Sequence, residues 1–223
     1  MSEVETAPAT TVRLRITEIF ASLQGESTRV GLPTVFVRLT GCPLRCSWCD
    51  TAYAFSGGET RTLDDILAEV AGHGLRHVCV TGGEPLAQKG CLALLAALCD
   101  AGHDVSLETS GALDIAGVDP RVSRIVDLKA PGSGELARNR WENLVLLRAH
   151  DELKFVLADA ADYDWAMRQI AGHRLAERCT VLLSPVAGAL DPAELAGWIV
   201  RDRLPVRFQL QLHKILWNDA RGR

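Results

Sequence analysis

Short β-rich segments alternate with segments of helical periodicity along most of the chain, and this alternation constrains the fold more than any other feature. The expected strands are residues 34–39, 77–83, 104–109, 123–129, 151–157, 179–186 and 206–213. The expected helices are residues 62–74, 86–102, 162–172 and 192–202. Such alternation is typical of βαβ units with a parallel sheet. Seven strands are fewer than the eight of a closed (β/α)₈ barrel, so we predict an α/β fold, a partial (open) parallel β/α barrel.

The composition is that of one globular domain. The 223 residues are 48% hydrophobic and 23% charged, and no linker or repeat divides them. We therefore expect a single domain over residues 13–223, preceded by a mobile N-terminal tail at residues 1–12. The tail is acidic and lacks the apolar region of a signal peptide.

Charge and cysteine usage narrow the possible partners and the compartment. A net charge of −4 argues against a broad nucleic-acid-binding face, and no apolar run has the roughly 20 residues that a membrane span needs. The number of cysteines is odd, seven in all, and no export signal precedes them. We therefore expect reduced thiols and a cytoplasmic protein.

Three cysteines lie close together in "GCPLRCSWCDT" (residues 41–51), with the spacing C-x₃-C-x₂-C. Iron–sulfur clusters take thiolate ligands, usually four, so Cys42, Cys46 and Cys49 would leave one iron open to another ligand. A zinc site usually takes four ligands in spaced pairs, and a three-cysteine zinc site or packed thiols are the alternatives. The other cysteines lie in apolar segments and are predicted to be core residues: Cys79, Cys91, Cys99 and Cys179.

Polar and glycine-rich segments follow several of the expected strands. The cysteine loop, "TGGEP" (81–85), "ETSG" (108–111), "DLK" (127–129) and "SP" (184–185) are all in this position. Since parallel α/β sheets carry their chemistry at the carboxyl ends of the strands, we expect one functional rim. The paired glycines of "TGGEP" would let the backbone approach a ligand, although an ordinary turn into a helix with proline at its first position is the alternative.

The cysteine loop followed by "TGGEP" resembles the radical S-adenosylmethionine superfamily. The resemblance implies a 4Fe–4S cluster whose open iron chelates S-adenosylmethionine, with the glycine-rich turn binding the methionine amino group and Trp48 beside the adenine. An exposed tryptophan without a role is the alternative for Trp48. The implied cofactor-binding residues are Trp48, Asp50, Gly82, Gly83, Glu84, Asp127, Leu128, Lys129, Ser184, Pro185, Val186 and Ala187. Many relatives carry Ser-Pro-Lys in place of residues 127–129, and residues 184–188 match only loosely.

Further motifs resemble the 7-carboxy-7-deazaguanine synthase family of that superfamily. They are "ITEIFASLQGES" (16–27), "TVFVRLTGC" (34–42), "CSWCDTAYAF" (46–55), "ETSG" (108–111) and "LQLHKILWN" (210–218). The resemblance implies radical ring contraction of 6-carboxy-5,6,7,8-tetrahydropterin to 7-carboxy-7-deazaguanine with loss of ammonia, on the route to queuosine. It also implies a homodimer and an external electron donor such as flavodoxin or ferredoxin.

The resemblance assigns roles to individual residues. Arg38 matches an arginine that binds the substrate carboxylate, with a structural ion pair as the alternative. Thr51 matches a threonine that binds Mg²⁺, with a local cap or turn hydroxyl as the alternative. His213 is either a substrate ligand or a satisfied histidine that ends the last strand. The implied substrate-binding residues are Leu23, Gln24, Gly25, Glu26, Arg38, Thr81, Glu108 and His213. The C-terminal "WNDARGR" is expected to close over the substrate.

Two other functions remain open from the sequence. A small glycyl-radical-activating enzyme of the same superfamily would act on a protein partner, and turnover of the pterin would distinguish it. A zinc or iron–sulfur binding module without enzymatic activity would have no affinity for S-adenosylmethionine.

Overall fold

The computed structural model describes residues 12–218 and 220–223, so the predicted tail lies outside the described residues except for Val12. The strands are β1 (Arg13–Leu23), β2 (Pro33–Leu39), β3 (Glu59–Thr62), β4 (His77–Gly82), β5 (Asp104–Thr109), β6 (Ser123–Asp127), β7 (Glu152–Leu157), β8 (Thr180–Pro185) and β9 (Arg207–Phe208). The α-helices are α1 (Leu63–Gly72), α2 (Cys91–Asp100), α3 (Ala160–Gly172), α4 (Pro192–Arg201) and α5 (Leu212–Trp217). Among the short 3₁₀ helices are η1 (Ala52–Phe55) and η2 (Pro85–Ala87).

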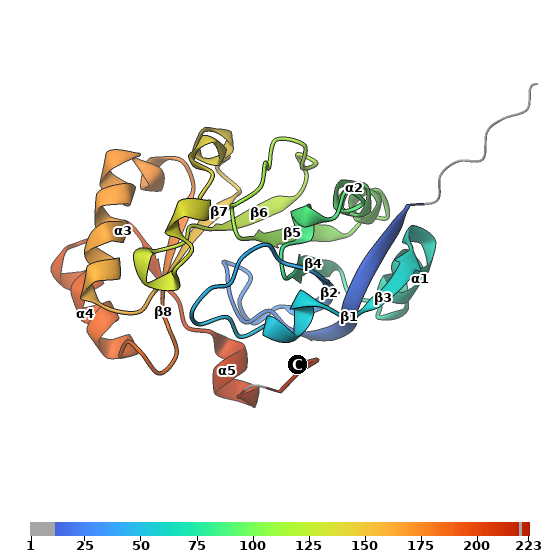
Figure 1. Cartoon of the computed structure of the whole chain (residues 1–223), viewed down its shortest axis with the longest axis horizontal. Helices are drawn as coiled ribbons and strands as arrows, with labels where there is room; N and C mark the ends of the chain where they lie inside the picture. The colour runs from blue at the N-terminus through green and yellow to red at the C-terminus, as the bar shows by residue number, and fades with distance from the viewer. Residues whose placement is uncertain (1–11, 219) are drawn as a thin grey trace, which may run out of the picture.

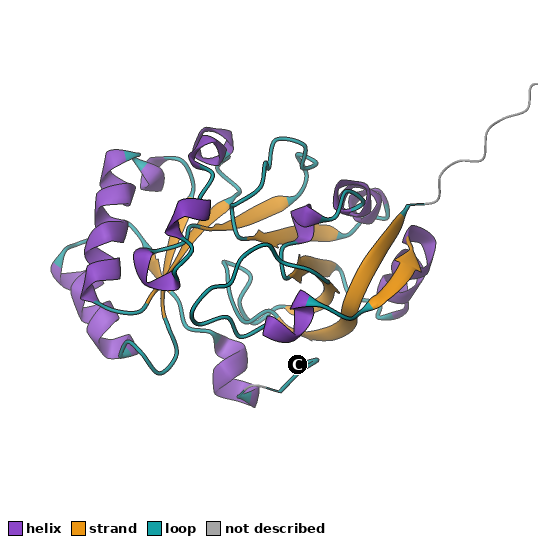
Figure 2. Cartoon of the chain, in the orientation of Figure 1, coloured by secondary structure: helices purple, strands orange, loops and turns teal. Residues whose placement is uncertain are grey.

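All the described strands form one open sheet in the order β3-β1-β2-β4-β5-β6-β7-β8-β9. From β2 to β9 every pairing is parallel, which confirms the predicted open parallel β/α architecture. In Figure 1 the strands follow an arc, with α1 to α4 on its outer side and α5 across its open side. Figure 2 shows loops filling the space inside this arc.

The antiparallel strands β1 and β3 were not predicted. Strand β1 pairs with both β2 and β3, and its register shifts between Ile16 and Glu18. Leu14 and Ile16 alternate with exposed residues, but most of the strand beyond them is half-buried. A bulge therefore interrupts the alternation on which a strand prediction depends.

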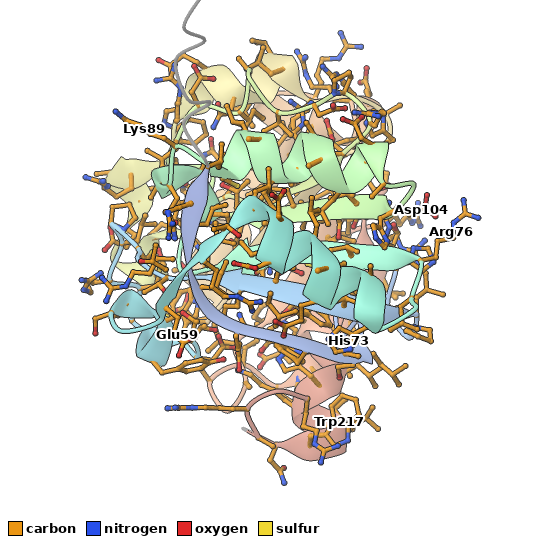
Figure 3. The ribbon with its side chains drawn as sticks, turned by 90° about the vertical axis from the view of Figure 1, so that its right-hand side faces the viewer. Glu59, His73, Arg76, Lys89, Asp104 and Trp217 are labelled. Carbon is orange, nitrogen blue, oxygen red and sulfur yellow. The ribbon has the colours of Figure 1, made fainter. Side chains whose placement is uncertain are left out.

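Capping residues mark both ends of helix α1. The Thr62 side chain accepts a hydrogen bond from the backbone N–H of Asp65 and caps α1, whose buried positions Ile66 and Val70 face the sheet. Gly74 has a φ of +65°, the left-handed conformation that commonly follows a helix end. Figure 3 shows α1 and α2 side by side over the strands, with Arg76 and Asp104 at the edge where β4 and β5 begin.

Two predicted elements are wrong in part. The helix expected over residues 86–102 begins only at Cys91, because the Gln88 side chain instead bonds the backbone of Arg15 and the carbonyl oxygen of Thr40. The strand expected over residues 206–213 is limited to Arg207–Phe208. The backbone N–H of Leu212 donates to the carbonyl oxygen of Gly25, and the chain then enters α5.

A continuous apolar core lies between the sheet and its outer helices. It includes Val37, Val80 and Leu107 from the strands and Leu94 and Leu195 from the helices, all at 0% exposure. Cys79, Cys91 and Cys179 are buried and Cys99 is half-buried, as their apolar contexts predict. Within the described ranges, no helix is long and apolar enough to cross a membrane.

Candidate active site

A cavity of about 320 Å³ opens inside the arc of strands. Its walls come from the cysteine loop, the carboxyl ends of the parallel strands, the loop after β1, and the C-terminal segment with α5. Figure 1 shows the chain after β2 and the helix α5 on this side of the sheet. A volume of this size suits a small molecule, and its position agrees with the predicted functional rim.

The three clustered cysteines all line this cavity. Cys42 and Cys46 are half-buried and Cys49 is exposed. The loop is anchored by backbone hydrogen bonds from Gly41 N to the Ala54 oxygen at 2.7 Å and from Ser47 N to the Ser133 oxygen at 3.0 Å. Burial raises the pKa of the Cys42 and Cys46 thiols, so binding of a metal would release their protons.

The donor set of this loop fits an iron–sulfur cubane. Over the described part of the chain, no group of three or more His, Cys, Asp or Glu side chains is arranged to hold a single metal ion. A cubane does not require such convergence, because each of its irons takes one protein ligand. Three thiols on one cavity wall, with space beside them, match a cluster that keeps one iron open to a small molecule.

The two glycines of the "TGGEP" turn are required by packing against the cysteine loop. A Cβ at Gly83 would overlap the carbonyl oxygen of Gly41, and one at Gly82 would overlap that of Leu39. The backbone N–H of Gly83 donates to the Leu39 oxygen at 3.1 Å, and that of Glu84 donates to the Gly41 oxygen at 2.8 Å. The two glycines therefore allow the turn to pack closely against the backbone of residues 39–41. Both glycines also line the cavity, where their backbone is open to a ligand.

The Glu84 side chain does not line the cavity, and its role as a cofactor-binding residue stays a prediction. It is fully buried, and its carboxylate accepts hydrogen bonds from the hydroxyls of Thr109 and Ser110 and from the backbone N–H groups of Ser110 and Leu86. Glu84 thereby ties the "TGGEP" turn to "ETSG". Since the sequence shows only that both segments follow strands, it could not reveal this link.

Polar groups from separate elements meet on the predicted substrate side of the cavity. Glu108 accepts hydrogen bonds from the Thr81 hydroxyl at 3.2 Å and from the Gln24 side-chain amide at 3.4 Å. Burial raises the pKa of Glu108, and the negative charge of Glu26 adds to this effect. Gly25 packs directly against His213, which leaves no room for a side chain at position 25. His213 lies in α5, not at the end of a strand.

Arg38 lines the cavity at the end of β2 and is held on one side only. Its Nε donates to Glu18 Oε1 at 2.7 Å, and the Tyr53 hydroxyl donates to the same oxygen at 2.7 Å. The guanidinium also lies 5.8 Å from the centre of the Phe20 ring and 5.9 Å from that of Tyr53. The predicted structural ion pair is thus present, and it involves Nε rather than the terminal nitrogens.

Thr51, Asp50 and Trp48 lie on the same wall as the cysteines. Thr51 precedes η1, but its hydroxyl makes no capping hydrogen bond and donates instead to Asp50 Oδ1 at 2.9 Å. Asp50 in turn pairs with Lys214 of α5 at 3.1 Å. Burial opposes ionisation of Asp50, but Lys214 and the Thr51 hydroxyl overcome it, and the net pKa is lowered.

The predicted nucleoside-binding residues divide between the cavity and the core. Asp127 and Lys129 line the cavity and form an ion pair of 3.0 Å, and Val186 and Ala187 also line it. The others do not line the cavity, and their contact with the cofactor stays a prediction. They are Leu128, Ser184 and Pro185, all buried beside or beneath the cavity wall.

Several residues that the sequence analysis did not select also line the cavity. The main polar ones are Tyr53, Ser110, Lys154, Gln211, Lys214 and Arg221. Lys154 carried a signal, since a lysine within the apolar segment "ELKFVL" is unusual in a buried strand. Gln211 and Lys214 carried none, because they reach the cavity only through the position of α5. Arg221 lies in "WNDARGR", whose closure over the substrate stays a prediction.

Comparison with known proteins agrees with this geometry. Residues 36–129 match the model of the Radical SAM superfamily. The crystal structure of QueE from Escherichia coli superposes with a TM-score of 0.74 and 25% sequence identity, covering 90% of this chain and 95% of that one. The cavity with its cysteine loop thus belongs to a radical S-adenosylmethionine protein.

Longer matches identify the family within this superfamily. The chain is 50% identical to the 7-carboxy-7-deazaguanine synthase of Chlorobaculum tepidum, over 96% of this chain and 99% of that protein. It is 44% identical to the protein of the same name from Koribacter versatilis, over 92% and 97% of the two chains. The chain belongs to the 7-carboxy-7-deazaguanine synthase family.

Proposed function

We propose that this chain converts 6-carboxy-5,6,7,8-tetrahydropterin to 7-carboxy-7-deazaguanine with loss of ammonia. One observation carries the proposal beyond family membership. The cysteine loop shares a single cavity with a set of hydrogen-bonding groups that suits a polar heterocycle, namely the buried Gln24 and Thr81 and the half-buried Glu108. A reactive group formed at the cysteine loop would therefore meet a bound heterocycle without crossing solvent.

Cys42, Cys46 and Cys49 would hold a 4Fe–4S cluster, and the adjoining residues of the cavity would hold S-adenosylmethionine. When bound and reduced, the cluster supplies the electron that cleaves the sulfonium of S-adenosylmethionine to a 5′-deoxyadenosyl radical. In this chain the backbone of Gly82 and Gly83 is the part of the "TGGEP" turn that faces the cavity. Glu84 keeps that turn in place from behind, through the hydrogen bonds described above.

Arg38 would bind the substrate carboxylate through its terminal nitrogens, since Glu18 takes up Nε. Glu108 would bind the pterin edge through its carboxyl group, which lines the cavity and whose pKa is raised by burial. The amide of Gln24 and the hydroxyl of Thr81 hold Glu108 in its orientation and border the same space. These contacts would orient the heterocycle without themselves taking part in radical formation.

Thr51 would bind Mg²⁺ together with substrate oxygens. Its hydroxyl faces the cavity and is not used as a helix cap. Mg²⁺ retains waters and often takes only one or two protein ligands, which suits this position. Asp50 is the neighbouring carboxylate, but its ion pair with Lys214 directs its charge toward α5.

The remaining features of the proposal follow from the family resemblance. The enzyme would act in the cytoplasm as a homodimer and receive electrons from an external donor such as flavodoxin or ferredoxin. The relatives favour this function over a glycyl-radical-activating enzyme, since proteins named 7-carboxy-7-deazaguanine synthase match this chain over nearly their whole length.

The test is turnover by anaerobically reconstituted protein. Protein carrying the cluster is incubated with S-adenosylmethionine, a reductant, Mg²⁺ and 6-carboxytetrahydropterin, and the products are identified by mass spectrometry. The expected result is 7-carboxy-7-deazaguanine, with none formed by the Cys46→Ala variant. Cleavage of S-adenosylmethionine without any deazaguanine would contradict the substrate assignment, and a protein that does not bind S-adenosylmethionine would contradict the enzyme class.

A further inference from the structure

Lys154 of β7 is an ionised side chain inside the cavity that no motif selects. It is 8% exposed, and its Nζ lies 2.5 Å from Glu26 Oε2 and 3.6 Å from Asp127 Oδ2. Glu26 follows β1 on the substrate side, close to Gln24, whereas Asp127 ends β6 and pairs with Lys129, a cation near Cys46. One ammonium group therefore contacts carboxylates from both halves of the cavity.

The two carboxylates are otherwise supported unequally. Asp127 has a second cationic partner, Lys129, at 3.0 Å. Among the described residues, Lys154 is the only cation in a salt bridge with Glu26, and the Gln211 amide donates to its other oxygen at 2.8 Å. Removal of Lys154 would thus leave Glu26 buried without a cationic partner, while Asp127 would keep one.

Buried ion pairs seldom add much to stability, since the cost of removing two charges from water offsets their attraction. Lys154 lies opposite Asp127 in the parallel β6–β7 pairing. The backbone pairing itself does not require a charged side chain at this position. A lysine here is better explained by the cavity than by the core. Its extended side chain carries the charge from the sheet to Glu26, 128 positions away in the sequence.

We propose that Lys154 is a positioning residue that holds Glu26 ionised and oriented toward the substrate while sharing its charge with Asp127 on the cofactor side. The assignment rests on the proposed function for the identity of the substrate. Glu26 would then accept a hydrogen bond from an N–H group of the heterocycle, and an ionised carboxylate is a stronger acceptor than a protonated carboxyl. Lys154 itself does not touch the reacting atoms.

The charges around this pair favour the arrangement. The groups that face it are Asp127 from β6, Glu108 from β5, Lys129 after β6 and His213 from α5. Burial opposes ionisation of Glu26, but Lys154 overcomes it and the pKa of Glu26 is lowered. Without Lys154, burial and the neighbouring carboxylates would both raise that pKa.

The test compares Lys154→Met, Lys154→Arg, Glu26→Gln and the double variant K154M/E26Q in the reconstituted enzyme. We expect K154M to lower kcat/KM for the pterin about 30-fold or more at pH 7, and to shift the acidic limb of the pH profile to higher pH. K154R should keep the parent profile and recover most of the rate. In the E26Q background, K154M should cost less than about threefold, since the two residues act as a unit.

Arg124→Met is the matched control. Arg124 is a fully buried cation on the neighbouring strand β6. It pairs with Asp151 at the amino-terminal ends of the strands, away from the cavity. This variant should lower the melting temperature without moving the pH profile. If K154M behaves in the same way as R124M, or costs as much in the E26Q background as in the parent, Lys154 is structural and the proposal is overturned.

A second measurement does not depend on turnover. The melting temperatures of parent and K154M are compared from pH 4 to pH 8 in the parent and E26Q backgrounds. The lowered pKa of Glu26 stabilises the parent above the unfolded pKa, and this term is lost as the pH falls. The deficit of K154M should therefore grow with pH more steeply in the parent than in the E26Q background, where only Asp127 and Glu108 remain as carboxylates near Lys154. Equal deficits in both backgrounds would overturn the coupling even if the parent made no deazaguanine.

Discussion

Replacement of Arg38 by alanine tests whether substrate recognition is separable from radical formation. Arg38 is the penultimate residue of β2, shortly before the cysteine loop, and its side chain is 16% exposed. Its backbone pairs with Thr81 in the β2–β4 ladder, but its side chain hydrogen-bonds Glu18 and none of the three cysteines. The variant should therefore lose affinity for the substrate carboxylate while keeping the cluster and S-adenosylmethionine.

The expected magnitude follows from the burial of the site. Deleting one partner of a desolvated charge pair costs about 2–5 kcal/mol, and each ~1.4 kcal/mol is a factor of ten in rate. Arg38→Ala should thus lower kcat/KM by about 30- to 3,000-fold. The lost pair with Glu18 is partly exposed and should cost only about 1 kcal/mol of stability, or roughly 2–4 °C in melting temperature.

The assay measures two products with the same protein. Deoxyadenosine formed without the pterin reports uncoupled cleavage of S-adenosylmethionine, and 7-carboxy-7-deazaguanine formed with the pterin reports the full reaction. Arg38→Ala should retain the first activity and lose most of the second. Arg38→Lys should recover only part of the loss, because a point charge replaces a planar group that can bind a carboxylate with two hydrogen bonds.

Glu18→Gln is the matched control, since it removes the ion pair and leaves the Arg38 charge in the cavity. It should cost less than about tenfold in kcat/KM. If Glu18→Gln costs as much as Arg38→Ala, the arginine acts through its ion pair with Glu18, and Arg38 is a structural residue. Loss of both activities in a folded Arg38→Ala protein that retains its cluster would instead place Arg38 in support of the cofactor site.

Four further predictions follow from the site. Cys46→Ala should lose the cluster and the activity together, whereas Cys79→Ala, which changes a buried core thiol, should keep the iron content and the absorbance of the parent. Thr51→Ala should blunt the stimulation of turnover by Mg²⁺ while binding S-adenosylmethionine with parental affinity; an unchanged Mg²⁺ response would place the site elsewhere. Glu84→Ala should lower the free energy of unfolding by about 3 kcal/mol, since several buried donors lose their acceptor, and a change below about 1 kcal/mol in denaturant titrations would contradict this. Burial raises the folded-state pKa of Glu108 from 4.5, so the fold is destabilised as the pH rises and this carboxyl ionises. Glu108→Gln should therefore be more stable than the parent between about pH 5 and pH 8 in thermal unfolding.

Local patterns predicted much of the fold because they depend on residues that are close in the sequence. The β-rich runs of the parallel strands and the Thr62 cap of α1 are examples that the structure confirms. Prediction was wrong where a distant partner decided the local structure. Gln88 leaves the helical pattern because it bonds strand β1, and residues 209–213 turn toward Gly25 instead of continuing a strand.

The sequence by itself determined the cysteine loop, the family and the rim on which the chemistry lies, because short motifs and strand ends are properties of contiguous residues. Only the tertiary structure decided what the side chains at that rim do. The Glu84 carboxylate links two loops from behind the cavity, and the Lys154 ammonium pairs inside the cavity with Glu26, 128 positions away. The physical reason is that a buried charge takes its role from the groups that surround it, and those groups meet only when separate strands end at the same edge of the sheet.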